Sequence, residues 1–136
     1  MFPIQTKILV VDDMAAMRLR LMNQLKAMGY TNIDQAENGQ EAFEVLEKKR
    51  SENNAIELVI SDWNMPVLSG IDLLEKVRSN IHYAKLPFIM VTAEGEKQQV
   101  VRALKIGVSD YLVKPVDKSV LGQKLASLWE RNKAAA

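Results

Sequence analysis

The sequence predicts an α/β fold, in which five helices cover a doubly wound parallel sheet of five strands. Two observations predict it. Five short apolar runs alternate along the chain with segments whose apolar residues recur every three or four positions, the pattern of βα units. The runs are apolar on both faces, which indicates a parallel sheet with helices on each side, and right-handed crossovers then allow the doubly wound arrangement.

The five predicted strands are too short for helices and are separated by residues that favour turns. They are residues 7–11, 33–36, 58–61, 88–92 and 111–113. A turn at residues 37–39 follows the second strand, Pro66 helps to break the chain after the third, and Pro87 opens the fourth.

The five predicted helices each carry an apolar stripe with a period near 3.6 residues. Their apolar positions fall within residues 14–28, 42–46, 71–77, 100–106 and 120–128. Gly107 is expected to end the fourth helix, and Asp117 or Ser119 to cap the fifth, in which Val120 is expected to be buried. The charged residues 47–54 are expected to form a frayed helix end and a surface loop.

Length and composition fit one soluble domain. The 136 residues, of which 48% are hydrophobic and 26% charged, are enough for a real core, so residues 1–136 are expected to be a single domain. Its core should span about residues 7–131, with 132–136 a tail or a cloning remnant.

Several functions are disfavoured by what the sequence lacks. A net charge of +1 offers no field that would attract nucleic acid or anionic lipid. The absence of cysteine excludes disulfides and thiolate metal sites, and the single histidine, His82, excludes a histidine-rich metal cluster. There is no apolar run of roughly 20 residues and no signal-peptide core, so a cytoplasmic location is expected.

Polar side chains follow every predicted strand except the second. Asp12 and Asp13 come after the first strand, Asp62 after the third, Thr92 ends the fourth and Lys114 follows the fifth. Sites in doubly wound sheets lie outside the carboxyl ends of the strands, so these side chains are expected to meet.

Three carboxylates brought together repel one another, and one lysine is too little to neutralise them. A divalent cation is therefore inferred, and a donor set made only of oxygen selects Mg²⁺, or Mn²⁺ as a substitute. Together with Lys114 and Thr92, the cation would cradle a phosphoryl group that the Asp62 carboxylate could accept. Trp63 is expected to be exposed beside this site.

These residues, with the segments 61–66, 90–94 and 111–115, resemble the receiver domain of two-component response regulators. Among them the chain is most similar to the single-domain chemotaxis regulators of the CheY type. The resemblance runs from about Lys7 to Trp129. It implies the flavodoxin-like strand order 2-1-3-4-5.

The resemblance implies roles for the acidic residues and the lysine. Asp62 would be the phosphoacceptor. Asp13, Asp62 and the main-chain carbonyl of Asn64 would bind Mg²⁺, while Asp12 would hold a water on the metal. Lys114 would pair with the phosphoryl oxygens.

It also implies a switch. Thr92 would move toward the phosphoryl group, and Tyr111 would turn inward as it does so. Asn64 and Glu94 would tune hydrolysis of the phosphoryl group. The bond between Lys114 and Pro115 would be cis.

The function implied is a phosphorylation-controlled binding module rather than an enzyme, one that catalyses only its own phosphorylation and dephosphorylation. A histidine kinase would supply the phosphoryl group. The face formed by the fourth helix, fifth strand and fifth helix would bind a protein such as a flagellar motor switch or another chemotaxis component. The domain is expected to be a monomer.

Three other classes of protein share parts of this pattern. The chain could be a receiver excised from a longer regulator with an enzymatic or DNA-binding output domain. A haloacid-dehalogenase-type phosphatase would need an Asp-x-Asp nucleophile motif after the first strand, which Asp12-Asp13-Met14 does not match. A flavodoxin would need a hydroxyl-rich phosphate loop there, which Met14-Ala15-Ala16 cannot supply.

Overall fold

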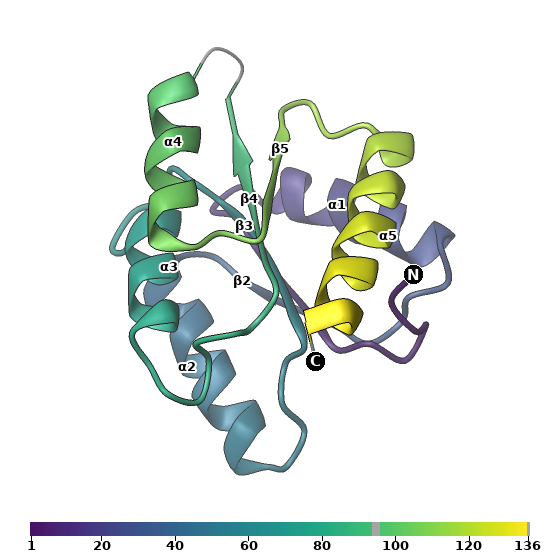
Figure 1. The fold of residues 1–136 in the computed structure, drawn as a ribbon, viewed down its shortest axis with the longest axis horizontal. Coiled ribbons are helices and arrows are strands. Elements are labelled where there is room, and N and C mark those ends of the chain that lie inside the picture. The colour runs from purple at the N-terminus through teal and green to yellow at the C-terminus, as the bar shows by residue number, and fades with distance from the viewer. Residues whose placement is uncertain (94–95, 136) are drawn as a thin grey trace.

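A computed structural model gives the fold (Figure 1), and it describes residues 1–93 and 96–135, with the last two of these by their backbone alone. Strands and helices alternate from β1 to α5 in the predicted order. The strands are β1 (Ile8–Val11), β2 (Ile33–Ala36), β3 (Leu58–Asp62), β4 (Phe88–Thr92) and β5 (Asp110–Val113). The helices are α1 (Ala15–Ala27), α2 (Gly39–Ser51), α3 (Gly70–Arg78), α4 (Lys97–Ile106) and α5 (Lys118–Ala135).

The strands form one parallel sheet in the order β2-β1-β3-β4-β5, which confirms the predicted fold class. Helices α1 and α5 cover one face, and α2, α3 and α4 cover the other (Figure 1). The central strands β1, β3 and β4 are buried along their whole length, as strands covered on both faces must be.

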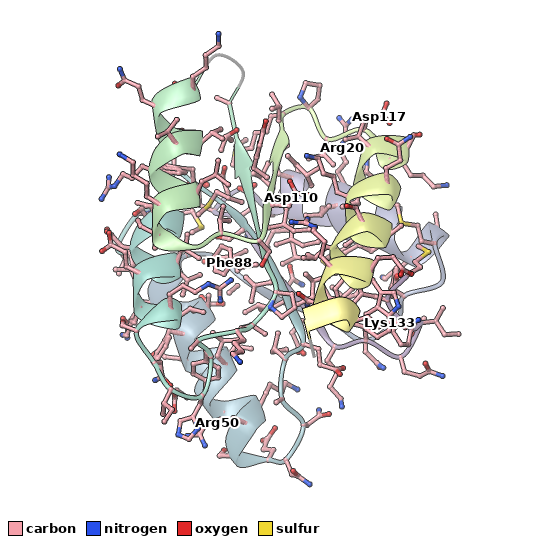
Figure 2. All side chains as sticks on the ribbon, in the orientation of Figure 1. Arg20, Arg50, Phe88, Asp110, Asp117 and Lys133 are labelled. Carbon is pink, nitrogen blue, oxygen red and sulfur yellow. The ribbon has the colours of Figure 1, made fainter. Side chains whose placement is uncertain are left out.

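Alternating side chains of the strands supply two hydrophobic cores. In β1, Leu9 and Val11 join the core beneath α2, α3 and α4, while Ile8 and Val10 join the core beneath α1 and α5. This is the two-residue period of a strand, and it explains why the run carries no polar residue. Figure 2 shows side chains filling both layers, with Phe88 in the interior and fully buried.

Three details of the helices differ from the expectations. Helix α2 does not fray at residue 47 but continues to Ser51. Ion pairs of 3.5 Å between Arg50 and Glu47 and 3.7 Å between Lys49 and Asp34 hold its last turn, where basic side chains also favour the helix dipole. Helix α5 continues through Ala135, so residues 132–135 extend a helix instead of forming a tail.

The start of α5 confirms one of the two predicted caps and holds the third difference, at Val120. Asp117, labelled in Figure 2, is the cap: its Oδ1 accepts hydrogen bonds from the main-chain nitrogens of Ser119 and Val120, at 2.8 and 3.2 Å. Val120 is 41% exposed rather than buried, because the buried stripe of α5 runs through Leu121, Leu125 and Leu128. Within the described part of the chain, no helix is long and apolar enough to cross a membrane.

Candidate functional site

The acidic site forms where β1 and β3 end side by side. Asp12 follows β1, and Asp62 is the last residue of β3, one residue beyond the predicted end of that strand. One carboxylate oxygen from each of Asp12, Asp13 and Asp62 lies within 4.8 Å of the others. Asp12 and Asp62 are buried and Asp13 is exposed. The parallel pairing of these two strands therefore brings the three predicted carboxylates together.

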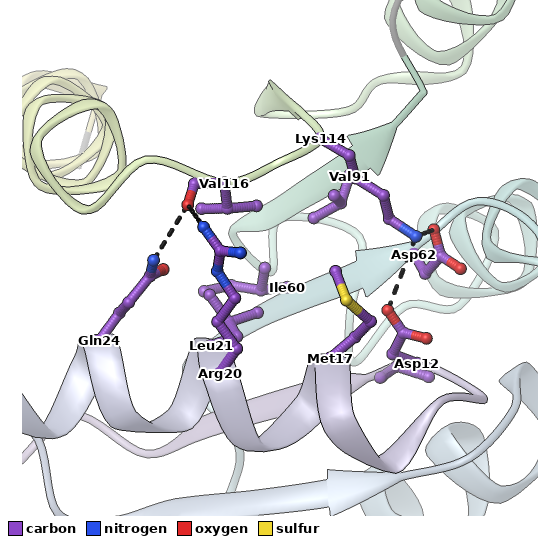
Figure 3. A pocket seen from close by; sticks show the side chains of 11 residues that line it. Asp12, Met17, Arg20, Leu21, Gln24, Ile60, Asp62, Val91, Lys114 and Val116 are labelled. Atoms are coloured by element: carbon purple, nitrogen blue, oxygen red, sulfur yellow. Dashed lines mark hydrogen bonds and ion pairs between the residues drawn. The ribbon is translucent and has the colours of Figure 1, made fainter.

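Lys114 reaches the same site from the end of β5, the strand at one edge of the sheet. Its Nζ lies 2.9 Å from Oδ1 of Asp62 and 3.8 Å from Oδ2 of Asp12, and Figure 3 shows it between the two carboxylates. Because β4 separates β3 from β5, the lysine must extend over the end of β4. The peptide bond between Lys114 and Pro115 is cis.

The charges in this site do not balance. Burial raises the pKa of the Asp12 carboxyl above 3.8, and the negative charge of Asp62 raises it further, while the hydrogen bond from the Met14 nitrogen and the charge of Lys114 oppose the shift. Burial alone would lower the pKa of Lys114, but its hydrogen bond to Asp62 and the nearby negative charges outweigh burial and raise that pKa. Among the residues that the structure describes, one ammonium group thus faces three carboxyl groups, a surplus of negative charge that favours a cation.

Thr92 and Tyr111 lie next to this site, around a hollow of about 300 Å³ between α4 and β5. Thr92 is 1% exposed, and its Oγ1 donates a 3.5 Å hydrogen bond to the Leu112 carbonyl. Tyr111 is half-buried, with Nζ of Lys124 4.7 Å from the centre of its ring. The two predicted switch residues therefore line one cavity. Asn64 is exposed two residues beyond Asp62, whereas Glu94 lies outside the described residues.

Comparison with known proteins identifies the family. Residues 8–126 match the model of the response regulator receiver domain. The chain belongs to this family. As a receiver domain it is a signalling switch rather than a conventional enzyme.

The similar proteins include several chemotaxis regulators. The chain is 45% identical over 119 residues to the chemotaxis protein CheY1 of Helicobacter pylori, a match that covers 88% of this chain and 93% of that protein. It is 44% identical to a CheY homolog of Campylobacter jejuni, over 88% of each chain. The solved structure of the chemotaxis response regulator CheY4 of Vibrio cholerae superposes with a TM-score of 0.80 at 30% identity, covering 91% of this chain and 98% of that one.

Two residues near the receiver site differ from what the sequence indicated. Trp63 is 6% exposed and packs in the core beneath α2 and α3, so the expectation of an exposed tryptophan was wrong. Arg18 was not identified, although it is buried near the acidic turn and donates a hydrogen bond to the Asp12 carbonyl. A signal for it existed: Arg18 shares the buried stripe of α1 with Leu21 and Leu25, where an arginine is unexpected.

Replacing Asp12 by asparagine is expected to stabilise the receiver domain in the absence of metal, by about 1 kcal/mol at neutral pH. The raised pKa means that ionised Asp12 destabilises the folded state relative to the unfolded chain. This penalty is fully present above the folded pKa and is relieved as the pH falls through that pKa toward 3.8. Asparagine can still accept the 2.9 Å hydrogen bond from the Met14 nitrogen.

Urea unfolding in EDTA between pH 7 and pH 4 measures this effect. The advantage of Asp12→Asn should shrink as the solution is acidified, and a variant less stable than the wild type at pH 7 would contradict the argument. Added Mg²⁺ should stabilise the wild type more than the variant, because a ligand stabilises the state that binds it.

Proposed function

We propose that this receiver domain is a CheY-like response regulator in which Asp62 accepts a phosphoryl group from a histidine kinase and thereby changes the α4-β5-α5 face. One observation carries the proposal: a buried carboxylate ends a central strand, lies 2.9 Å from a lysine ammonium, and shares its site with two more carboxylates. A structural aspartate at that position would need only the lysine.

The donor set fits Mg²⁺. Carboxylate oxygens of Asp12, Asp13 and Asp62 lie within 4.8 Å of one another, and the hard oxygen ligands that Mg²⁺ prefers are the ones present. Asp13, Asp62 and the main-chain carbonyl of Asn64 would hold the ion, with Asp12 holding a water on it. When bound, the ion neutralises the phosphoryl oxygens and the excess carboxylate charge.

The chain's own groups would then carry out the transfer. An oxygen of Asp62 attacks phosphorus in line as the bond between phosphorus and the kinase imidazole nitrogen breaks, and the electron pair of that bond stays on the imidazole. The Lys114 ammonium, which pairs with Asp62 before transfer, pairs with a phosphoryl oxygen afterwards. The hydroxyl of Thr92 leaves the Leu112 carbonyl and moves toward the phosphoryl group, so Tyr111 can turn into the hollow that both residues line.

The α4-β5-α5 face has the composition of a binding surface. Four apolar side chains, each more than 40% exposed, come from its three elements. They are Val101 and Leu104 of α4, Val113 of β5 and Val120 of α5. These exposed apolar side chains are available to contact a protein partner. We propose a chemotaxis component, such as a flagellar motor switch protein, as the partner, in line with the names of the similar regulators.

Incubation with acetyl phosphate tests the first step directly. We expect intact-protein mass spectrometry to detect one added phosphoryl group with Mg²⁺ present and none when EDTA replaces it. A phosphoryl group acquired equally well in EDTA would overturn the proposed metal-dependent transfer.

Lys114→Ala is expected to leave Mg²⁺ binding largely intact while uncoupling the site from the α4-β5-α5 face, because Lys114 is not among the proposed metal ligands. With Mg²⁺ and the phosphoryl mimic beryllofluoride, amide resonances of that face should shift strongly in the wild type and lose most of that shift in the variant. Lys118→Ala, which removes an exposed lysine at the start of α5, is the matched control and should behave like the wild type. Equal shifts in Lys114→Ala and the wild type would exclude the proposed role of Lys114.

A further inference from the structure

Arg18 is a buried cation whose side chain makes two hydrogen bonds and one longer ion pair. Its Nη1 donates a 2.7 Å hydrogen bond to the Asp12 main-chain carbonyl, and its Nε donates a 2.8 Å hydrogen bond to Oε1 of Gln35. Its Nη2 lies 3.9 Å from Oε1 of Glu37. The side chain is 11% exposed, whereas that of Glu37 is 66% exposed. The three contacts join α1 to the turn after β1 and to the end of β2.

These contacts do not amount to an ordinary ion pair. The nearest carboxylate is distant and solvated, and the two short hydrogen bonds go to neutral oxygens. Burying a guanidinium group costs free energy that a weak surface pair does not recover. What the group does supply is a rigid fork of donors, which can hold several acceptors in fixed relative positions.

The buried hydrogen bond of the Arg18 guanidinium goes to the Asp12 carbonyl, in the turn that carries two of the three carboxylates. The Asp12 carbonyl is part of the peptide unit that joins Asp12 to Asp13. On the N-terminal side of Asp12, its main-chain nitrogen donates a 3.1 Å hydrogen bond to the Ala36 carbonyl. The Met14 nitrogen, at the start of α1, also donates a 2.9 Å hydrogen bond to Oδ1 of Asp12, but the Met14 side chain makes no capping hydrogen bond.

We infer that Arg18 is a positioning residue for the metal site: it fixes the peptide between Asp12 and Asp13 so that both carboxylates are aimed at the ion. The inference rests on the proposed function, because it assigns a role toward the Mg²⁺ of that same site. Groups that orient metal ligands without touching the metal commonly change affinity by 10- to 100-fold when removed.

If Arg18 acts only through its charge, its removal should change Mg²⁺ affinity in one direction, and if it positions the Asp12–Asp13 peptide, in the other. The inference is therefore testable. A positive charge near the acidic cluster repels Mg²⁺, so its removal should strengthen metal binding if only the electrostatic field mattered. Loss of the fork frees the peptide and should weaken binding. The sign of the change therefore separates the two roles.

The test is Mg²⁺ titration by calorimetry of the wild type, Arg18→Gln and Arg18→Lys, with Arg20→Gln as the control. We expect Arg18→Gln to bind Mg²⁺ about tenfold more weakly or worse. Arg18→Lys keeps the charge but not the fork, so it should also bind more weakly. Arg20 lies on the same helix, and its Nη2 donates to the Val116 carbonyl at 3.3 Å, away from the Asp12 turn (Figure 3). Its loss should leave binding unchanged or slightly stronger.

A second measurement separates positioning from general damage. At Mg²⁺ concentrations that saturate each protein, phosphorylation of Arg18→Gln by acetyl phosphate should return to near the wild-type rate, so the defect lies in metal affinity. Metal affinity in Arg18→Gln equal to or above that of the wild type would overturn the inference, and if that variant does not fold, wild-type affinity in Arg18→Lys would do so. A wild type that binds no Mg²⁺ would instead overturn the proposed function, and the role of Arg18 with it.

Discussion

Asp62→Asn is expected to abolish Mg²⁺-dependent phosphorylation of this receiver domain. The amide nearly matches the carboxylate in shape, so it should fit at the end of β3, where Asp62 is 6% exposed. It lacks the anionic oxygen that attacks phosphorus, and it removes the charge that pairs with Lys114 at 2.9 Å. Intact-protein mass spectrometry after incubation with acetyl phosphate and Mg²⁺ should show one phosphoryl group on the wild type and none above background on the variant.

Asp72→Asn is the matched control for this experiment. Asp72 is an exposed aspartate in the first turn of α3, outside the group of three carboxylates. The same change of aspartate to asparagine there should leave phosphorylation at the wild-type level. Modification of Asp62→Asn to the same extent as the wild type would falsify the assignment of Asp62 as the phosphoacceptor.

The position of this site could be predicted from sequence because it follows from topology. Strand ends are recognisable as the points where apolar runs stop, and parallel strands place all their carboxyl ends at one edge of the sheet. Asp12, Asp13, Asp62 and Lys114 were therefore expected at one edge of the sheet once five βα units were identified. The strand order 2-1-3-4-5, which the resemblance implied, then brings them together, and the structure groups them within hydrogen-bond or metal-ligand reach.

Features that depend on tertiary contacts could not be predicted as well from the sequence. Trp63 follows a strand end like its polar neighbours, but the loop that leads to α3 turns its ring inward to the core. The last turn of α2 is polar and carries no apolar stripe to indicate a helix, and its ion pair to Asp34 comes from another element. Arg18 contacts Gln35, which is 17 residues away, so its role depends on how β1 and β2 pair.

Gly70→Ala is expected to destabilise the domain by about 3 kcal/mol or more, the upper range for overpacking a buried position. A Cβ at Gly70 would lie 2.1 Å from the main-chain oxygen of Asp62 and 2.9 Å from Sδ of Met90. The methionine could turn aside, but the Asp62 oxygen is part of the backbone at the end of β3. The Gly70 nitrogen also donates a 2.8 Å hydrogen bond to the Trp63 carbonyl, so α3 cannot shift away without breaking it.

The destabilisation should come with a functional defect, because the backbone atom that blocks the new methyl group belongs to Asp62, the proposed phosphoacceptor. Urea unfolding should show the loss of stability, and the folded fraction of Gly70→Ala should bind Mg²⁺ more weakly than the wild type, since relief of the clash displaces Asp62. Gly122→Ala is the control. Gly122 lies within helix α5, and the nearest atom to a Cβ there is Cε of Met28, at 3.9 Å. That change should stabilise the domain by roughly 0.5–1 kcal/mol, because alanine loses less backbone entropy than glycine on forming a helix. Equal unfolding free energies for the two variants would show that the close approach of α3 to Asp62 carries no cost, and that the end of β3 can move freely under the helix.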